Sequence, residues 1–477
     1  MGRDAYVVGA GPNGLAAAIE LARAGLEVKL IEAADEVGGG LRSAELTLPG
    51  FVHDVCASVV PLAVASSFMA TLPLSELGVR FVEPELCLAH PLPGGDAVVL
   101  ARELDETCEG LGLDGARYRR LLEPLVAAKD ELFATFLGPL TVPREPRAAL
   151  AAARFGPAAL SSAQLLARTA FRGHRARALF AGLAAHAIQP LERPGTAAFG
   201  LMLAISGHSA GWPFVAGGSG KLAEALARHF TDLGGVIETG RKVTSVAELP
   251  EDAHVLLDLA PKAVLEILGE RLSGRYRRGL QRYRYGPGVF KLDIALSGPV
   301  PWLAEACRRA GTVHVGGTLE EIAAAERLVW RGVHPQRPFV LVAQPSLLDA
   351  ERAPAGKHTL WAYCHVPHGS EVDMSEAVLR QIERFAPGFR DLILASHART
   401  AAGYERYDPN FVGGDINTGV QDLRQLFTRP VARLDPYSTP DERFFICSSA
   451  TPPGGGVHGL CGAGAARSLL RRLELGA

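Results

Sequence analysis

The beginning of the chain carries the segment that decides the fold: residues 5–43 read AYVVGAGPNGLAAAIELARAGLEVKLIEAADEVGGGLRS. Residues 5–8 form a short apolar run with a strand pattern, and residues 15–24 are rich in Leu, Ala and Ile, which favours a helix that Gly25 ends. A second strand-like run follows at residues 28–31. The segment therefore predicts a β-α-β unit of conventional length.

Three glycines, Gly9, Gly11 and Gly14, form a G-x-G-x-x-G fingerprint between this strand and this helix. In such a fingerprint the first glycine permits a tight turn, the second lets the backbone approach a pyrophosphate, and the third lets helix and strand pack closely. Glu32, next to Ala33 at the end of the second strand, is placed to accept hydrogen bonds from ribose hydroxyls, and its charge disfavours a 2′-phosphate. We expect a dinucleotide site here; the alternative is a plain set of turn glycines.

A second glycine cluster, Gly38, Gly39 and Gly40, follows the second strand and is itself followed by Arg42. It resembles the second glycine motif of FAD enzymes of the glutathione-reductase and amine-oxidase superfamily. The resemblance implies that these four residues line the pyrophosphate and the flavin end of FAD. An ordinary surface arginine is the alternative for Arg42.

Four further blocks extend the resemblance over most of the chain: PGFVHD at residues 49–54, GGSGKL at 217–222, NFVGGDI at 410–416 and CSSATPPGGGVHG at 447–459. Together they resemble the phytoene-desaturase-like branch of the FAD-dependent amine-oxidase superfamily, whose members are called phytoene dehydrogenase or carotenoid oxidoreductase. The resemblance implies an FAD-dependent oxidoreductase. Nothing in residues 105–210 identifies a tunnel for a C40 polyene, so the substrate does not follow from the resemblance.

The resemblance also adds members to the cofactor site. The last block implies a helix that begins beneath the isoalloxazine ring, with Gly456 and Val457 close to the ring and the Val457 amide at flavin O2; a plain glycine-rich turn is the alternative. A helix N-terminus carries unsatisfied N–H groups and about half a positive charge, which stabilises an anionic reduced flavin. Val243 is expected to present its backbone to the adenine. No cysteine or histidine lies in a motif for flavin attachment, so we expect FAD to be bound without a covalent link.

With 477 residues, the chain exceeds what one hydrophobic core usually serves. We expect an α/β protein in which a glutathione-reductase-type, Rossmann-like FAD domain is discontinuous in sequence and a mixed α+β domain binds the substrate. After a helix at residues 221–229, strand-like runs of the nucleotide domain are expected at residues 236–239 and 243–246. The expected ranges are 1–75, 212–285 and 405–477 for the FAD domain, and 76–211 and 286–404 for the substrate domain, with a helix-rich insertion at about 105–210.

Three residues are candidates for catalysis. Residues 285–292 resemble the amine-oxidase strand whose lysine is bonded through water to flavin N5, which gives Lys291 that role; a solvated strand residue is the alternative. His53 and His458 flank the flavin-side motifs, and each is a candidate for a flavin hydrogen bond or a proton relay near neutral pH. A structural role is the alternative for both.

Large side chains alternate at Trp361, Tyr363 and His365, as the wall of an apolar pocket requires, although core packing explains the same pattern. The leading hypothesis is a desaturase or dehydrogenase that removes hydride from a C–C or C–N bond of a small apolar molecule and passes electrons to oxygen, a quinone or another acceptor. A flavin amine oxidase is one alternative, with Tyr437 in an aromatic cage for a small amine. An FAD-binding scaffold with little turnover is the other.

Composition excludes several classes of function. The net charge is −2 and no run of like charge is long, so we expect no nucleic-acid partner. The seven cysteines show no C-x-x-C pair and no metal-ligand spacing, so we expect no metal and a reducing compartment. No stretch of about eighteen apolar residues and no signal peptide is present, which predicts a cytoplasmic protein and leaves only peripheral contact with a membrane open.

Overall fold

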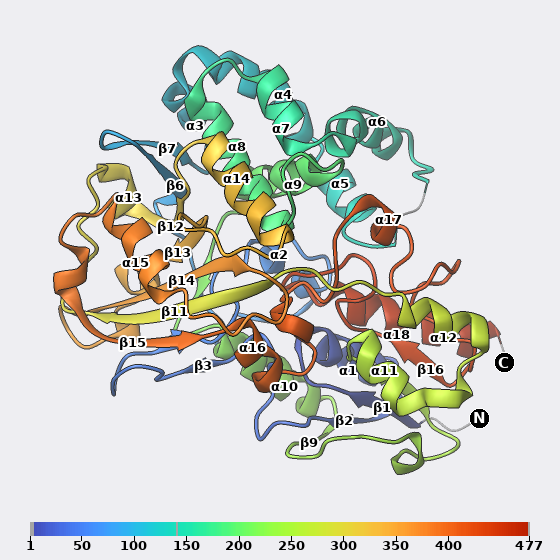
Figure 1. Cartoon of the computed structure of the whole chain (residues 1–477). Coiled ribbons are helices and arrows are strands. Elements are labelled where there is room, and N and C mark those ends of the chain that lie inside the picture. Colours follow the sequence, from blue (N-terminus) through green and yellow to red (C-terminus); the bar gives the residue numbers. More distant parts are fainter. Residues whose placement is uncertain (1–3, 140–141, 476–477) are drawn as a thin grey trace.

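The computed structural model describes residues 4–139 and 142–475 as two β-sheets and a layer of helices (Figure 1). The first sheet is parallel and five-stranded, in the order β16-β10-β1-β2-β9. Because all its strands run in one direction, the residues that follow β1, β2 and β10 meet at one edge. Its strands are β1 (Asp4–Val8), β2 (Glu27–Ile31), β9 (Val236–Glu238), β10 (His254–Leu257) and β16 (Phe444–Ile446).

Alternate residues of these strands face two different cores. Val7 and Leu256 are directly opposite each other and pack with one helix group, whereas Val8 and Leu257 pack with the other. The apolar strands are therefore covered on both faces, as a parallel sheet requires. The first helix group is α1 (Pro12–Arg23), α10 (Gly220–Asp232) and α18 (Leu460–Leu475), and the second is α11 (Pro261–Leu268) and α12 (Gly274–Gln281).

One expected strand is wrong. Residues 243–245 form a loop that runs into the 3₁₀ turn η4 (Val246–Glu248), not a strand. Ser245 and Glu248 form a capping box. The Ser245 side chain accepts a hydrogen bond from the backbone of the turn, and the Glu248 side chain accepts one from Ser245 N. These side chains satisfy backbone N–H groups that a strand would have paired with a neighbour.

The second sheet is seven-stranded, in the order β15-β11-β14-β13-β12-β6-β7, and only the β12–β6 pair is parallel. On one face, Phe290, Leu292 and Ile294 of β11 join a core that includes α15 (Ser375–Glu383). The opposite face carries Val289, Lys291 and Asp293. Its strands are β6 (Leu86–Leu92), β7 (Asp96–Leu100), β11 (Gly288–Leu296), β12 (Ala310–Val315), β13 (Val340–Ala343), β14 (His358–Val366) and β15 (Ile393–Arg399).

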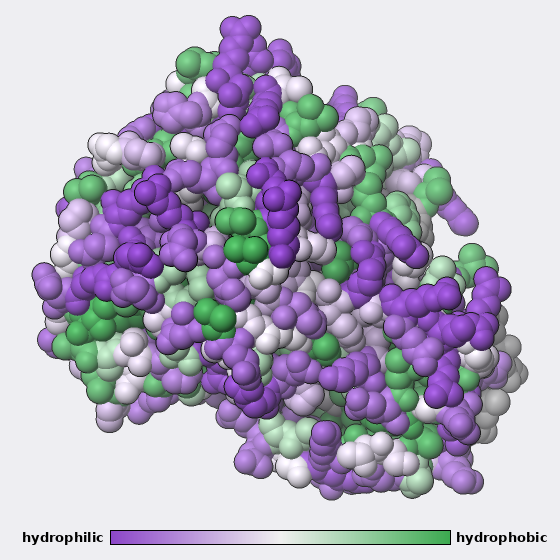
Figure 2. All heavy atoms as spheres, in the orientation of Figure 1, coloured by the Kyte–Doolittle hydropathy of each residue, from purple (hydrophilic) through white to green (hydrophobic). Residues whose placement is uncertain are grey.

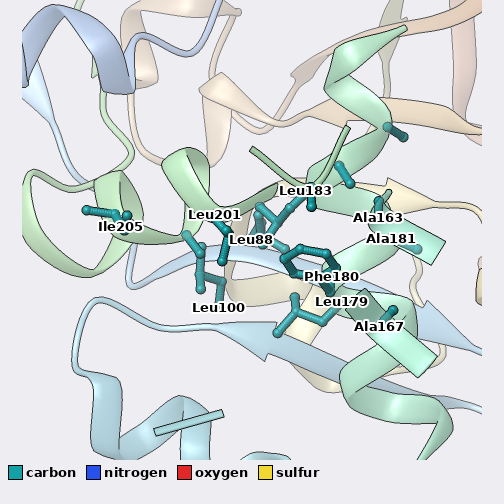
Figure 3. Close-up of a cluster of buried hydrophobic side chains, with 14 of the residues drawn as sticks. Leu88, Leu100, Ala163, Ala167, Leu179, Phe180, Ala181, Leu183, Leu201 and Ile205 are labelled. Atoms are coloured by element: carbon teal, nitrogen blue, oxygen red, sulfur yellow. The ribbon is translucent and has the colours of Figure 1, made fainter. Parts of the chain in front are cut away.

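Helices cover part of that opposite face, and Figure 1 shows them as the layer above the sheet. Leu88 and Leu100 pack in one cluster with Leu179, Phe180 and Leu201 (Figure 3). The layer places an apolar roof over the sheet. Its helices are α3 (Leu104–Gly110), α4 (Gly115–Val126), α5 (Lys129–Phe136), α6 (Pro146–Leu160), α7 (Ala163–Ala170), α8 (His174–Ala184) and α9 (Thr196–Ser209), with α14 (Leu319–Trp330) beside them.

Shorter elements connect the two sheets: β3 (Ser43–Ala44) pairs with β4 (His53–Asp54), and β5 (Phe81–Val82) with β8 (Phe214–Val215). The molecular face in Figure 2 is mainly hydrophilic, with hydrophobic side chains scattered over it. None of the helices in the described part of the chain is long and apolar enough to cross a membrane.

Candidate functional site

A cavity of about 750 Å³ extends from the edge of the parallel sheet to the face of the seven-stranded sheet. We call its first part the groove and its second part the chamber. The groove is lined by Gly9–Asn13, Glu32–Ala34, Gly39–Arg42, Val243, Asp258 and Asp408, and the chamber by Lys291, Trp361, Tyr363, Leu341, Thr312, His186, Phe199 and Met202. The cavity thus joins residues from both sheets and from the helical layer.

The first glycine loop leaves no room for side chains. A Cβ on Gly14 would stand 1.9 Å from the Gly9 carbonyl oxygen, and one on Gly11 would stand 2.9 Å from Asp258 Oδ2. Gly9 has φ +101°, which other residues rarely adopt. The loop therefore brings bare backbone and the N-terminus of α1 to the groove, which fits a pyrophosphate.

Glu32 is held so that its carboxylate faces the groove. Its Oε2 accepts a hydrogen bond from Ala10 N at 2.7 Å, and its Oε1 accepts one from Ala34 N at 2.9 Å. Oε1 also accepts from the Arg42 guanidinium at 3.4 Å, so Oε2 is the oxygen that keeps a further lone pair for a ribose hydroxyl. The adjacent Ala33 also lines the groove, as does Val243.

The second glycine loop packs on the first. Gly38 N donates to Ala10 O at 2.8 Å, and a Cβ on Gly39 would stand 3.2 Å from Gly11 Cα. Arg42 is 6 % exposed, and its guanidinium donates to Glu36 O at 2.6 Å and to Val37 O at 3.2 Å. The structure therefore places a fixed cation on the groove, which is not the position of an ordinary surface arginine.

Two acidic residues of the groove were not predicted. Asp258 Oδ2 accepts from Gly14 N at 2.8 Å, and burial raises its pKa to about 8. Burial also raises the pKa of Asp408, and Glu32 lies near enough to both to raise their pKa further. Asp258 could have been found as the polar residue that ends the apolar run Val255–Leu257, because ligands bind beyond the carboxyl ends of parallel strands.

Gly456, Val457 and His458 line the cavity just before α18 begins at Leu460. His458 Nδ1 accepts from Leu460 N at 3.0 Å, so its Nε2 donates to Gly454 O at 3.2 Å. Burial lowers the pKa of His458 to about 4. Both ring nitrogens are thus occupied by the backbone, which is the arrangement of a neutral capping residue, and a proton relay through His458 stays a prediction.

Lys291 lines the chamber and contacts Asp293, two residues further along β11. His53 Nδ1 lies 3.6 Å from Asp293 Oδ1, and His397 Nδ1 lies 3.8 Å from Asp293 Oδ2. Burial lowers the pKa of Lys291 and lowers that of His53 to about 4. For Asp293, burial acts to raise the pKa, but the Lys291 ammonium and His397 outweigh it and the pKa is lowered. His53 stands behind this pair and does not line the cavity.

Two aromatic side chains form the chamber wall beside Lys291. Trp361 Nε1 donates to Cys56 O at 3.0 Å, and the Trp361 and Tyr363 rings meet edge to face with centroids 5.0 Å apart. His365 was expected in the same wall, but it does not line the cavity. Its Nδ1 lies 2.8 Å from Glu326 Oε1.

Tyr437 also lies away from the expected pocket. Its hydroxyl donates to Pro452 O at 3.1 Å, and its ring packs in the core between the parallel sheet and α18. A Cβ on Gly464 would stand 2.4 Å from this hydroxyl, so the tyrosine is enclosed by the helix. The structure therefore corrects the expected aromatic cage: Tyr437 lines neither the groove nor the chamber.

Comparisons with known proteins agree with this geometry. The sequence model of a family described as flavin containing amine oxidoreductase matches residues 13–466. The chain is 26 % identical to rat pyridine nucleotide-disulfide oxidoreductase domain-containing protein 2, over 99 % of this chain and 94 % of that protein. It is 29 % identical to phytoene dehydrogenase of Streptomyces griseus, over 82 % of this chain and 78 % of that one.

Among solved structures, a triple mutant of putrescine oxidase has a similar fold, with a TM-score of 0.65 and 19 % identity over 99 % of both chains. At this identity the likeness concerns the fold alone. It confirms the predicted fold class, an α/β cofactor-binding domain joined to a mixed substrate domain.

Proposed function

This chain belongs to the flavin-containing amine oxidoreductase family, and from this premise we propose that it oxidises a C–C or C–N bond of a small apolar molecule, removing hydride from one carbon atom while the neighbouring carbon or nitrogen atom loses a proton. The chain is an FAD-dependent oxidoreductase, and its predicted resemblance to the phytoene-desaturase-like branch of the superfamily is confirmed. The identity of the substrate and of the electron acceptor is our proposal.

The groove residues fit FAD part by part. The loop Gly9–Gly14 and the N-terminus of α1 would hold the pyrophosphate, with Arg42 supplying a positive charge. Glu32 would bind the ribose, and the backbone at Gly456 and Val457 would lie toward the ring. When bound, FAD supplies the hydride acceptor, and the protein's part is to position the substrate and exclude water.

The observation that carries the proposal is the apolar chamber that adjoins this groove. Phe199 and Met202 of α9 form its roof, and Trp361, Tyr363 and Leu341 form its floor. Such a surface binds an apolar molecule by removing it from water. Lys291 is the charged group at the chamber, and we propose that it orients a water molecule or a proton at the reacting end.

The proposed acceptor is oxygen or a quinone. A second dinucleotide fingerprint with its strand and acidic residue does not occur in the sequence, so we expect no resident nicotinamide site.

An amine oxidase is the second candidate, because Lys291 lies beside the aromatic pair Trp361 and Tyr363. Its difficulty is the charge of the chamber. The acids Glu32, Asp258 and Asp408 line the groove, whereas none of the described residues that line the chamber is acidic. An ammonium substrate would therefore meet the Lys291 charge and no carboxylate among the described residues of the chamber lining, since Asp293 is paired with Lys291, and a neutral substrate fits better.

The test is purification of the full chain, an absorption spectrum, and anaerobic bleaching of the flavin against a panel of apolar alkenes, alcohols and amines. We expect a flavin spectrum, release of FAD into the supernatant after acid precipitation, and bleaching by a neutral apolar compound. Bleaching by amines with peroxide release in air would establish the second candidate instead. A flavin that no compound reduces would favour the scaffold hypothesis.

A further inference from the structure

The chamber floor runs across four neighbouring strands and has a polar group at each end. Lys291 of β11 is directly opposite Tyr363 of β14, Tyr363 is opposite Leu341 of β13, and Leu341 is opposite His314 of β12. Directly opposite residues share one face of a sheet. Because neighbouring strands are about 4.8 Å apart, the two ends of this row are separated by about 14 Å.

The end opposite Lys291 is built around His186, which follows α8 in the 3₁₀ turn η3 (Ala185–Ala187). His186 lines the chamber, and its Nε2 lies 3.2 Å from His314 Nε2. Thr312, two residues before His314 on the same strand, lines the chamber too, and its Oγ1 accepts from Trp212 Nε1 at 3.0 Å. Apolar side chains separate this polar end from Lys291.

Behind His186 lies a buried polar cluster that the flavin chemistry does not use. His90 Nε2 donates to Gly317 O at 2.6 Å, and His365 Nδ1 lies 2.8 Å from Glu326 Oε1. The remaining ring nitrogens of His90, His314 and His365 are buried, and none has a hydrogen-bond partner among the described residues. Unpaired buried polar atoms cost stability, so a polar cluster kept in this core indicates a role that apolar side chains would not fill. His186 is the member of the cluster that lines the chamber, and it is therefore the one that a ligand can reach.

The residues that line this end of the chamber, His186 and Thr312, are polar without being charged. Burial lowers the pKa of His186 to about 3, with His365 lowering it further, and burial lowers the pKa of His90 to about 4. Burial and the neighbouring His186 and His90 hold the pKa of His314 well below its usual value. The imidazoles of His186, His90 and His314 are therefore neutral at neutral pH. A neutral imidazole exchanges hydrogen bonds with a hydroxyl or carbonyl, whereas an ionic group would lose its hydration without gaining a counter-charge.

We propose that His186 binds a neutral polar group, a hydroxyl or a carbonyl, at one end of an elongated apolar substrate whose reacting bond lies at the Lys291 end. The identification of the reacting end rests on the proposed function. With C–C bonds of about 1.5 Å, an extended chain of about ten carbon atoms is about 11 Å long, and one hydrogen bond of about 3 Å at its polar end brings the span to about 14 Å. The substrate class is thus a short apolar chain or terpene-sized molecule with an alcohol or ketone group at its far end.

The experiment measures binding to the oxidised, FAD-loaded protein, without turnover, through the fluorescence of Trp212 and Trp361 at the chamber wall. The probes are 1-decanol and 1-chlorodecane, which match in length and differ in hydrogen bonding. We expect 1-decanol to bind about three- to tenfold more tightly, the effect of one net hydrogen bond. Decanoic acid and decylamine should bind more weakly than the alcohol.

His186→Phe keeps the ring and should abolish the preference for the alcohol while leaving the affinity for 1-chlorodecane within about twofold. His186→Asn restores a hydrogen-bonding group and should restore part of the preference. The matched control is His174→Phe, since His174 is exposed at the start of the same helix that leads to His186. Thermal unfolding and the flavin spectrum show whether each variant is folded.

Equal binding of the two probes by the unchanged protein, or an alcohol preference that survives in His186→Phe, would overturn the inference. Its failure is distinct from failure of the proposed function. A protein that prefers the alcohol but never bleaches its flavin keeps this binding site and loses the reaction. A protein whose flavin is bleached by apolar compounds without any role for His186 keeps the reaction and loses this site.

Discussion

Asp293 lies two residues after Lys291 on β11, and its carboxylate contacts the Lys291 ammonium where each side chain is only 1 % exposed. A buried ion pair loses the hydration of both charges, so removing one partner leaves an uncompensated charge. We therefore predict that Asp293→Asn lowers the free energy of unfolding by about 3–5 kcal/mol.

Urea denaturation of the FAD-loaded protein measures this effect. The double variant Lys291→Met/Asp293→Asn should lose less stability than the sum of the two single variants, because no charge is left unpaired. Asp130→Asn is the matched control: its exposed pair with Lys129 should contribute at most about 1 kcal/mol. Strict additivity of the two single changes would contradict an interaction between Lys291 and Asp293.

The second prediction concerns the role of the Lys291 charge. Lys291→Met keeps the length of the side chain and removes the ammonium, so the variant should still bind FAD. Flavin reduction or reoxidation should slow about ten- to a thousandfold, equivalent to about 1.4–4 kcal/mol of barrier. Stopped-flow absorbance follows both half-reactions separately. Lys262→Met, at an exposed surface lysine, is the control. Rates within about twofold of the parent in both half-reactions would make Lys291 a bystander.

The third prediction is a pH dependence set by Asp258. Its pKa of about 8 in the folded chain, against 3.8 for an ordinary aspartate, means that the folded state holds a proton that the unfolded state has lost. This contribution to the stability of the apoprotein is full below about pH 3.8 and is lost as the pH rises toward about 8. Above that pH the ionised carboxylate faces the pyrophosphate, so the FAD dissociation constant should rise.

Titration calorimetry in buffers of different ionisation enthalpy measures the affinity and the protons taken up together. Asp258→Asn keeps an oxygen for Gly14 N and should flatten the pH dependence through this range. If FAD binding by Asp258→Asn kept the pH profile of the parent, the titration would belong to another group. Asp408, which interacts with Asp258, is the acidic candidate.

Features built from residues that are close together in the chain could be predicted from the sequence, whereas features built from distant residues could not. The glycine loops and Glu32 were found because the β-α-β unit is local: strand, turn and helix lie within about thirty residues. The row from Lys291 to His314 depends on the register of four strands that are distant in sequence, and no local pattern encodes that register. The strand expected at residues 243–246 failed because alternating apolar residues did not reveal the capping box of Ser245. Tyr437 was misplaced because an aromatic residue near the flavin motif is equally suited to the core.

The fourth prediction tests the first glycine loop. Gly11→Ala would place a methyl group 2.9 Å from Asp258 Oδ2 and toward the approach of the pyrophosphate, so FAD loading should be abolished. Gly156→Ala in α6 is the control, because nothing lies within 4 Å of its added Cβ. The ratio of flavin to protein absorbance after purification gives the loading. Full loading of the Gly11 variant would move the pyrophosphate away from this loop.

The fifth prediction concerns Glu32, whose two oxygens accept hydrogen bonds from Ala10 N and Ala34 N while facing the groove. Glu32→Ala should weaken FAD binding by about 1–3 kcal/mol, because it removes the ribose partner and leaves buried N–H groups unpaired. Glu32→Gln supplies only one acceptor oxygen and places an amide donor against a backbone N–H group. FAD binding should therefore weaken almost as much as in Glu32→Ala. Glu36→Ala is the control in the same loop, since that side chain is 72 % exposed. Thermal unfolding of the apoproteins separates a distorted loop from a lost ribose contact. A Glu32 variant with the apoprotein stability of the parent and weak FAD binding supports the contact. An unchanged FAD dissociation constant would place the ribose elsewhere.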